Sequence, residues 1–495
     1  MKTDKRVSII GLLTALTVTV PLAAQTHHHY KLIDLGTFGG PNSSTQDELQ
    51  VLNSQGMIAG KADASIPNHP NACLFCSSSF ISHAFQWRNG ILHDLGALPG
   101  ANSSGANWIA DSGLTAGFSE TDETDPSPFL PGPLVGIRQM HAVLWKDGHI
   151  TDLGTLEGGY ESVAFAVNSR GQVAGGGFNT VPDPFSFLGT QQRVFLWQNG
   201  VMEDLGTLGG PDAGLVGSFK GNVEMNESGQ VVACSYTNST VNPITGTPTV
   251  DPFLWENGAM IDIGTLGGTS GCAVYLNNRG QVVGYSNVAG DLTFHPFLWE
   301  RGIMKDLGTL GGTFGFANWI NDAGEVTGGA TILGDRALHA FSWKNGIMTD
   351  LGTLPGDVVS QPQAVNSRGQ VVGASSQTPD FTANRAFLWE SGGPMVDLNA
   401  LVISGLGVQL LSAVDINNRG EIDAVGVLPT GDTHAILLIP CDENHPDVEG
   451  CDYSSVRVSP ASAGPAPHEA PRPAMPAMLW GRNNRSYFPT LSPKR

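Results

Sequence analysis

One phrase, approximately WxNGxMxDLGTLGG, recurs eight times between residues 30 and 440. Successive copies are 44 to 60 residues apart, a period typical of repeat proteins built from supersecondary units. The repeat therefore constrains the architecture more strongly than any single residue, although it does not by itself name an activity. The aspartate of the phrase marks each copy, at Asp34, Asp94, Asp152, Asp204, Asp262, Asp306, Asp350 and Asp397.

Each repeat contains four short apolar runs, bounded by Gly and Asn, and such runs predict β-strands. The chain holds 64 glycines and 31 prolines among 495 residues, and only 14% of its residues are charged. This composition favours many short strands joined by tight turns over helices. In the fifth repeat the four runs are Met260–Ile263, Ala273–Leu276, Val282–Tyr285 and Pro296–Trp299.

Two joints of each repeat have the sequence of tight hairpin turns. An Asn-Gly or Asp-Gly pair follows the Trp in most copies and favours the positive φ angles of a type I′ turn. The second joint is Asn-x-x-Gly, as at Asn321 to Gly324, where the Asn side chain can bond its own backbone and the Gly takes the left-handed conformation. We expect a shortened variant of this joint in the second repeat, from Asp111 to Gly113.

The strands are apolar on both faces, so each sheet needs cover on both sides. In the run from Ala84 to Trp87 the two rings share one face, and Ala or Leu occupies the other face in most copies. Radially packed sheets meet this need, because each one lies between two neighbours. We therefore predict an all-β fold, a closed β-propeller of about eight four-stranded blades.

The two ends of the repeat region are incomplete in complementary ways. The region opens at Tyr30 with the DLG half of a hairpin, and it ends with an apolar strand, His434 to Ile439, that lacks its partner. Pairing the last strand with the first would close the ring and remove two exposed edges. An open β-solenoid is the alternative, and it would leave both halves unpaired.

Most copies place a His-Ala-Phe-like phrase ahead of the DLG phrase, as in HAFSW at 339–343 and DLG at 350–352. This combination resembles the extracellular HAF-repeat family over about residues 30–440. The resemblance implies an exported bacterial protein built from HAF repeats, and it implies no particular reaction. The histidine is present at His83, His141, His295, His339 and His434, whereas Arg193, Asp251 and Arg385 replace it in other copies.

The N-terminal residues have the features of an export signal. A basic start is followed by an apolar run from Val7 to Leu22 and by Ala23 and Ala24 before Gln25. An uncleaved membrane anchor is the alternative. We expect a secreted, cell-surface or periplasmic protein divided into a signal peptide at 1–24, a His-containing segment at 25–29, the repeat region at 30–440, a Cys-bracketed acidic loop at 441–453 and a Pro/Ala-rich flexible tail at 454–495.

Charge and cysteine content limit the partners and the compartment. Removing residues 1–24, which hold three basic residues and one acid, would move the net charge from −20 to −22. A surface this acidic argues against nucleic acid and anionic membranes. The tail lacks the apolar residues that a membrane span needs. We expect the protein to be a monomer. Six cysteines fit an oxidising compartment, and the disulfide candidates are Cys73, Cys76, Cys234, Cys272, Cys441 and Cys451.

Residues present in every repeat have equivalent surroundings, so we interpret them as structural. The DLG aspartates are expected to accept hydrogen bonds from the GTLGG bend, and the alternative is a ring of carboxylates around a cation. Function is expected where the repeats differ. Four long connections, predicted as loops at 61–82, 118–140, 176–192 and 234–250, should lie side by side on one face, opposite the tight turns. They are interpreted either as a binding surface or as tolerated insertions.

The candidate site residues lie in these loops and at the new N-terminus. The first set is His69, Cys73, Cys76 and His83, which we interpret either as a zinc site or as a disulfide or two thiols. The second set is Glu120, Asp122, Glu123 and Asp125, which we interpret either as a weak calcium site or as a solvated loop. His27, third after the expected cleavage site, could bind Cu(II) or Ni(II). No other cofactor is expected.

No nucleophile elbow, P-loop, dinucleotide fingerprint or HExxH motif occurs in the sequence. We therefore predict a ligand- or partner-binding protein that uses the loop face of repeats 1–4 for an extracellular glycan or protein. The alternative is a propeller enzyme acting on an extracellular polymer such as a polysaccharide, and no catalytic residue can be named for it.

Overall fold

The computed structural model describes residues 25–46, 49–69, 72, 78–126, 136–186, 189–214, 223–243, 245–403, 407–446 and 448–458. Strands dominate this part of the chain, in which the 3-10 turn η2 (Leu398–Ala400) is a short helical exception. No helix within it is long and apolar enough to cross a membrane.

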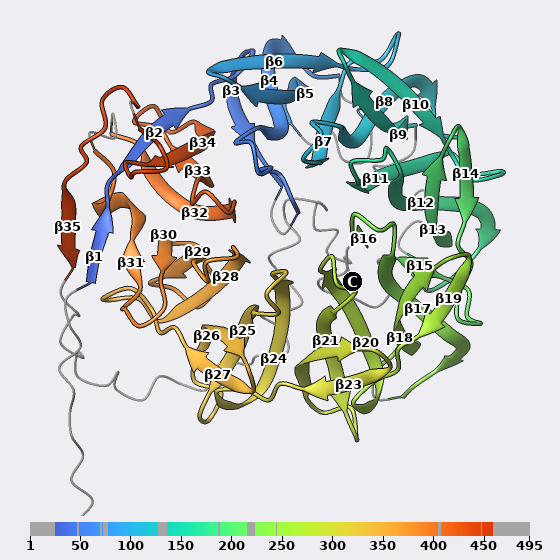
Figure 1. The fold of residues 1–495 in the computed structure, drawn as a ribbon. Coiled ribbons are helices and arrows are strands. Elements are labelled where there is room, and N and C mark those ends of the chain that lie inside the picture. Colours follow the sequence, from blue (N-terminus) through green and yellow to red (C-terminus); the bar gives the residue numbers. More distant parts are fainter. Residues whose placement is uncertain are drawn as a thin grey trace, which may run out of the picture.

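The described strands form eight units, called blades 1 to 8, which are arranged in a ring (Figure 1). Blades 1 to 4 contain β3 (Gly39–Ser44), β4 (Ile58–Pro67), β5 (Phe80–Arg88) and β6 (Ile91–Gly96); β7 (Ser104–Ile109), β8 (Thr115–Thr124), β9 (Arg138–Lys146) and β10 (His149–Gly154); β11 (Glu161–Val167), β12 (Val173–Pro182), β13 (Thr190–Gln198) and β14 (Val201–Asp204); and β15 (Ala213–Gly214), β16 (Glu224–Met225), β17 (Val231–Val241), β18 (Pro248–Glu256) and β19 (Ala259–Asp262). Blades 5 to 8 contain β20 (Gly267–Leu276), β21 (Val282–Val288), β22 (Phe294–Glu300) and β23 (Ile303–Asp306); β24 (Gly311–Ile320), β25 (Val326–Ile332), β26 (Leu338–Lys344) and β27 (Ile347–Asp350); β28 (Val359–Val365), β29 (Val371–Ser376), β30 (Asn384–Trp389) and β31 (Val396–Asp397); and β32 (Gln409–Ile416), β33 (Ile422–Val427), β34 (Thr433–Pro440) and β2 (Tyr30–Asp34). Each blade has four strands, except that in blade 4 both β15 and β16 pair with β17 at the inner position.

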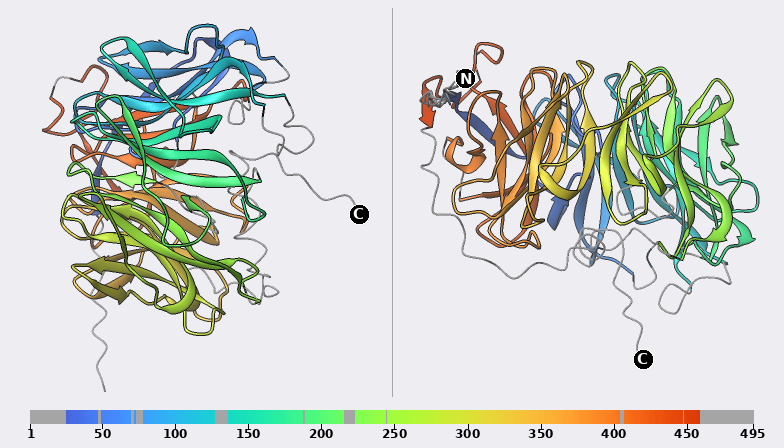
Figure 2. Two further views of the ribbon diagram at one scale, coloured as in Figure 1. Left: turned by 90° about the vertical axis from the view of Figure 1, so that its right-hand side faces the viewer. Right: turned by 90° about the horizontal axis from the view of Figure 1, so that it is seen from below.

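Strand order within a blade places the DLG phrase on the outside. The strand before each Asn-x-x-Gly turn is innermost and packs against the innermost strands of neighbouring blades, as β24 does with β20 and β28. Because successive strands are antiparallel, both tight turns lie on one side of the ring, called the tight-turn face. The connections between second and third strands and the GTLGG bends lie on the other, called the long-hairpin face. Figure 2 shows the blades edge-on, side by side around the ring.

Both ends of the repeat region meet in blade 8, as the sequence predicts. β2 pairs antiparallel with β34, with Tyr30 opposite Pro440 and Asp34 opposite Ile436. Beside this sheet β1 (Gln25–His28) pairs with β35 (Ser455–Val458). The flexible tail is expected to begin at residue 454, but residues 455–458 form a strand instead. This strand pairs with the N–H and C=O groups of β1, which would otherwise be a free sheet edge.

The tight turns have the predicted backbone conformations. Asn89 and Gly90 both have positive φ, of 50° and 79°, as a type I′ turn requires. In the Asn-x-x-Gly turns the asparagine side chain accepts backbone hydrogen bonds within its own turn, as Asn321 Oδ1 does. The shortened variant expected in the second repeat is wrong. Ala110 occupies the asparagine position there, because its backbone pairs with Leu114 and accepts from Gly113 as in the other turns.

Glycine in the second strand lets the innermost strand approach closely. At Gly328 in β25 a Cβ would collide with the carbonyl oxygen of Phe316 in β24. We expect Gly328→Ala to lower the free energy of unfolding by about 2–3 kcal/mol, measured by urea denaturation, because backbone would have to move. Gly176→Ala in β12 is the control, since its Cβ would meet nothing closer than 3.6 Å. Equal losses for the two variants would contradict this account.

Candidate functional site on the long-hairpin face

The described residues of the four long connections lie mainly in strands, which corrects the prediction of loops at 61–82, 118–140, 176–192 and 234–250. The second strands of blades 1 to 4, namely β4, β8, β12 and β17, are 10 or 11 residues long, against 6 or 7 for their counterparts β21, β25, β29 and β33. Each long hairpin continues past a register shift at an equivalent position. Cross-strand backbone pairing explains the difference, because it satisfies polar groups that an irregular loop would leave to water.

The first long hairpin is joined to the second by an ion pair. His69 Nε2 lies 2.5 Å from Glu120 Oε1. The other Glu120 oxygen accepts the backbone N–H groups of Asn102 and Ser103, both at 3.1 Å. Glu120 is fully buried, so these donors compensate a charge that would otherwise be costly.

Two pairs of carboxyl groups lie at the next junctions. Asp125, after β8, and Glu161, at the start of β11, join blade 2 to blade 3, and Glu161 Oε2 accepts the backbone N–H of Met140 at 3.1 Å. Burial, with the neighbouring Asp125 carboxyl second, raises the pKa of Glu161 well above its usual range. A carboxyl kept neutral in this way can donate a hydrogen bond to its partner.

The second carboxyl pair occupies the equivalent position between β12 and blade 4. Asp183 and Asp212 are 3% and 1% exposed. Burial, and then the Asp183 carboxyl, raises the pKa of Asp212 to about 8, although Gln192 N–H donates to Asp212 Oδ1 at 2.8 Å and Arg193 lies nearby. At neutral pH the two carboxyls therefore share one proton.

A disulfide joins the fourth long hairpin to blade 5. Cys234 in β17 and Cys272 in β20, two of the disulfide candidates, form it with a Cα–Cα distance of 4.9 Å. Nearby, Asn242 donates to Thr269 Oγ1 and to Asp291 Oδ2. Contacts between blades thus accompany all four hairpins.

Exposed aliphatic side chains form an arc along this face. They lie at the ends of the second strands or in the short connections that follow them, in blades 1, 3, 4, 5 and 6. Their exposed fractions range from 45% to 78%. The residues are Ile66, Val181, Val241, Leu292 and Leu333, and they are called the aliphatic arc.

Each His-Ala-Phe phrase brings its first residue against the aspartate of the DLG phrase. In blade 1, His83 Nδ1 lies 3.0 Å from both carboxylate oxygens of Asp94, and Gly96 N–H donates to Asp94 Oδ1 at 2.7 Å. Partial burial alone would raise the pKa of Asp94, but these donors outweigh it and lower that pKa. The predicted bond from the GTLGG bend is present, while the pairing with histidine was not foreseen. The same pairing joins His141 to Asp152, His295 to Asp306, His339 to Asp350 and His434 to Asp34.

Blade 4 departs from this pairing. In blades 3 and 7 arginine replaces the histidine, with Arg193 at 3.5 Å from Asp204 and Arg385 at 3.2 Å from Asp397. In blade 4 the position holds Asp251 instead. Burial, and then the Asp262 carboxylate, raises the pKa of Asp251 to about 6, and its Oδ1 is buried without a hydrogen-bond partner.

The remaining predicted site residues do not converge. Cys73 and Cys76 lie outside the described residues. Asp122 and Glu123 are exposed, while their neighbours Glu120 and Asp125 are buried in the contacts above. Among the described residues no group of three or more His, Cys, Asp or Glu is placed to hold a metal ion. His27 is 2% exposed and its Nδ1 lies 2.8 Å from Glu390 Oε2, so that nitrogen is already engaged.

The tight-turn face carries a second set of contacts between blades. Each asparagine named below donates from Nδ2 to the backbone carbonyl at the equivalent position of the next blade, at 2.8 to 3.1 Å. The series runs Asn226 to Asn277, Asn321, Asn366, Asn417, Asn53 and finally Ala110. The step from Asn417 to Asn53 crosses from blade 8 to blade 1.

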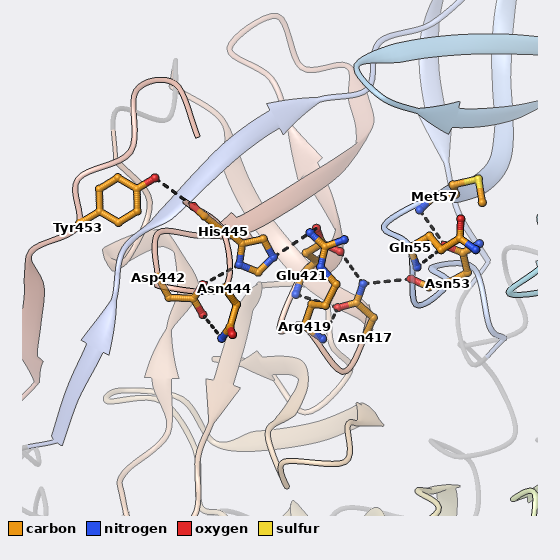
Figure 3. A network of polar contacts seen from close by, with 10 residues as sticks. All are labelled: Asn53, Gln55, Met57, Asn417, Arg419, Glu421, Asp442, Asn444, His445 and Tyr453. Atoms are coloured by element: carbon orange, nitrogen blue, oxygen red, sulfur yellow. Dashed lines mark hydrogen bonds and ion pairs between the residues drawn. The ribbon is translucent and has the colours of Figure 1, made fainter. Parts of the chain in front are cut away.

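The Cys-bracketed loop lies beside this series on the blade 8 side, where His445 approaches Glu421 (Figure 3). Cys441 and Cys451, two of the disulfide candidates, form a disulfide with a Cα–Cα distance of 5.4 Å. Within the loop His445 is buried between Asp442, at 2.7 Å, and Glu421, at 3.5 Å. Burial alone would lower the pKa of His445, but these two carboxylates raise it.

Comparisons with known proteins give no family for this chain. No protein-family model matches the sequence, and no curated protein matches it. The β-propeller domain of the Trilobed protease from Pyrococcus furiosus is similar, with 10% identity, 75% of this chain and 96% of that chain covered, and a TM-score of 0.40. So are the Pyrococcus horikoshii acylaminoacyl peptidase (10% identity; 81% and 57%; 0.39) and the Trypanosoma rangeli sialidase (8% identity; 83% and 59%; 0.30). The chain spans a little under three fifths of these two. The radial four-stranded sheets define the class, an all-β protein of the β-propeller type.

Proposed function

We propose that this chain is an exported, closed eight-bladed propeller of the HAF-repeat family that binds an extracellular glycan or protein through its long-hairpin face. Closure is supported by the pairing of β2 with β34 and by the hydrogen bond from Asn417 to Asn53, which join the two ends of the repeat region. Export is supported by two disulfides, which suit an oxidising compartment. The signal peptide expected at 1–24 lies outside the described residues.

The observation that carries the binding role is the equivalent construction of four neighbouring hairpins. All four extend past the same register shift, and contacts to the next blade accompany each one. Insertions without a role would not need this support, whereas a binding surface gains affinity when its shape is held before the ligand arrives. The aliphatic arc supplies exposed apolar area on the same face.

The test is binding of the full chain to a panel of bacterial polysaccharides and surface proteins, with and without calcium. Val181→Lys combined with Val241→Lys should weaken binding at least about tenfold, because two apolar contacts would be replaced by charges on flexible stems. Val201→Lys is the matched control, since Val201 is 65% exposed but lies at a tight turn on the opposite face. Equal effects of the two variants would contradict the assignment of ligand binding to the long-hairpin face. Shortening of a panel polymer during incubation would instead favour the enzyme alternative.

A further inference from the structure

Blade 4 has a carboxyl pair where the other blades have an ion pair. In seven blades His or Arg from the third strand contacts the DLG aspartate, and in blade 4 the corresponding position holds Asp251, facing Asp262. Asp251 Oδ1 is buried and has no hydrogen-bond partner. The repeat serves as an internal control, because the equivalent position holds His or Arg in each of the seven other blades. The position is therefore suited to a cation supplied from elsewhere.

The surroundings of this pair favour a cationic group carried on an apolar peptide. Val181 in blade 3, Val241 in blade 4 and Leu292 in blade 5 are 49%, 45% and 78% exposed on the same face. A small ion would gain nothing from these side chains. A peptide with arginine and large apolar residues would use both features.

The chain itself contains such a segment outside the described residues. Residues 472–495 hold five basic residues and no acid, in a chain whose net charge is −20, and they also contain Met478, Leu479 and Trp480. The thirteen residues at 459–471, which separate this segment from β35, can span at most about 45 Å. Arg482 and Arg485 are a further ten or more residues along, and the 23 residues at 459–481 can span at most about 80 Å.

We propose that residues 472–495 bind to the long-hairpin face at blades 3 to 5, where an arginine side chain takes the place between Asp251 and Asp262 that His or Arg takes in the other blades. The segment would then cover part of the surface to which we assign ligand binding. The contact needs no ligand, and it is tested without one, so its failure leaves the proposed function standing.

Hydrogen exchange of the full chain, read by mass spectrometry, provides the first test. In the natural chain, amides around Arg482 should exchange at least about tenfold more slowly than in the same segment as a free peptide, as expected for a bound segment. Asp251→Arg places the residue of blades 3 and 7 at this position and should remove that protection. Asp122→Arg makes the same charge change at an exposed position and should not. Absent protection in the natural chain, or equal loss in both variants, would overturn the proposal.

A peptide in trans provides the second test and does not depend on the folding of the Asp251 variant. A synthetic peptide of residues 472–495 should bind the full chain carrying Arg482→Glu and Arg485→Glu, whose own segment is displaced. It should bind the natural chain about fivefold to tenfold more weakly, through competition, and binding should weaken with added salt. Equal binding to both chains would show that the chain's own segment does not occupy this site, and this outcome also contradicts the proposal.

Discussion

Replacing Asp212 by asparagine is expected to stabilise the protein, and this advantage should grow with pH. In the folded chain the pKa of Asp212 is about 8, whereas in the unfolded chain it returns to about 3.8. A carboxyl whose pKa is raised on folding keeps its full contribution to stability below the unfolded pKa and loses it as pH rises through the folded pKa. An asparagine side chain has N–H donors at every pH, whereas the carboxyl pair has a proton to donate only below about pH 8. The advantage of the variant should increase by about 2–4 kcal/mol between pH 5 and pH 9.

Urea unfolding at pH 5, 7 and 9 measures this effect. The groups facing Asp212 are Asp183, which shares its proton, Arg193, which opposes the shift, and Tyr236, whose pKa is raised to about 12 by burial and by these two carboxyls. Asp122→Asn removes an exposed carboxyl and should leave the pH profile unchanged. Parallel profiles for the natural chain and Asp212→Asn would mean that the two carboxyls do not share a proton.

The regular part of the fold could be predicted from sequence because its signals are local. Glycine and asparagine at fixed offsets define both turns, and the apolar runs between them define the strands. The incomplete first and last copies even predicted the pairing of β2 with β34. In contrast, Ala110 was missed because an alanine gives no turn signal, and only the backbone bonds around it reveal the repeated geometry.

The contacts of the candidate site could not be predicted in this way. His83 and Asp94 lie on adjacent strands, and pairing them requires the strand register, which neither phrase specifies alone. The long hairpins give no strand signal in the sequence, because their strands are polar and end beyond a register shift. Contacts between blades, such as His69 with Glu120, join residues from different repeats and depend on how neighbouring blades pack.

Replacing Asn417 by alanine is expected to cost about 2–4 kcal/mol of folding free energy, because several buried groups lose their partner together. Asn417 Oδ1 accepts from Arg419 N–H and Glu421 N–H, while Nδ2 donates to Glu421 Oε2 at 2.6 Å and to Asn53 O at 3.0 Å. The side chain is 7% exposed, so water cannot readily replace these bonds.

Because Asn417 lies where blade 8 meets blade 1, the strands that exchange faster in the variant are informative as well as the loss of stability. Asn366→Ala is the matched control, since it removes the equivalent bond between blades 7 and 8, which the chain also joins covalently. Blades 8 and 1 meet instead through β2 and the Asn417 bond. Both variants should lose stability in urea, but only Asn417→Ala should speed hydrogen exchange in β2 and β34. Similar exchange in both variants would mean that β2 alone holds the seam, and that the asparagine series stabilises each turn without joining the ends of the ring.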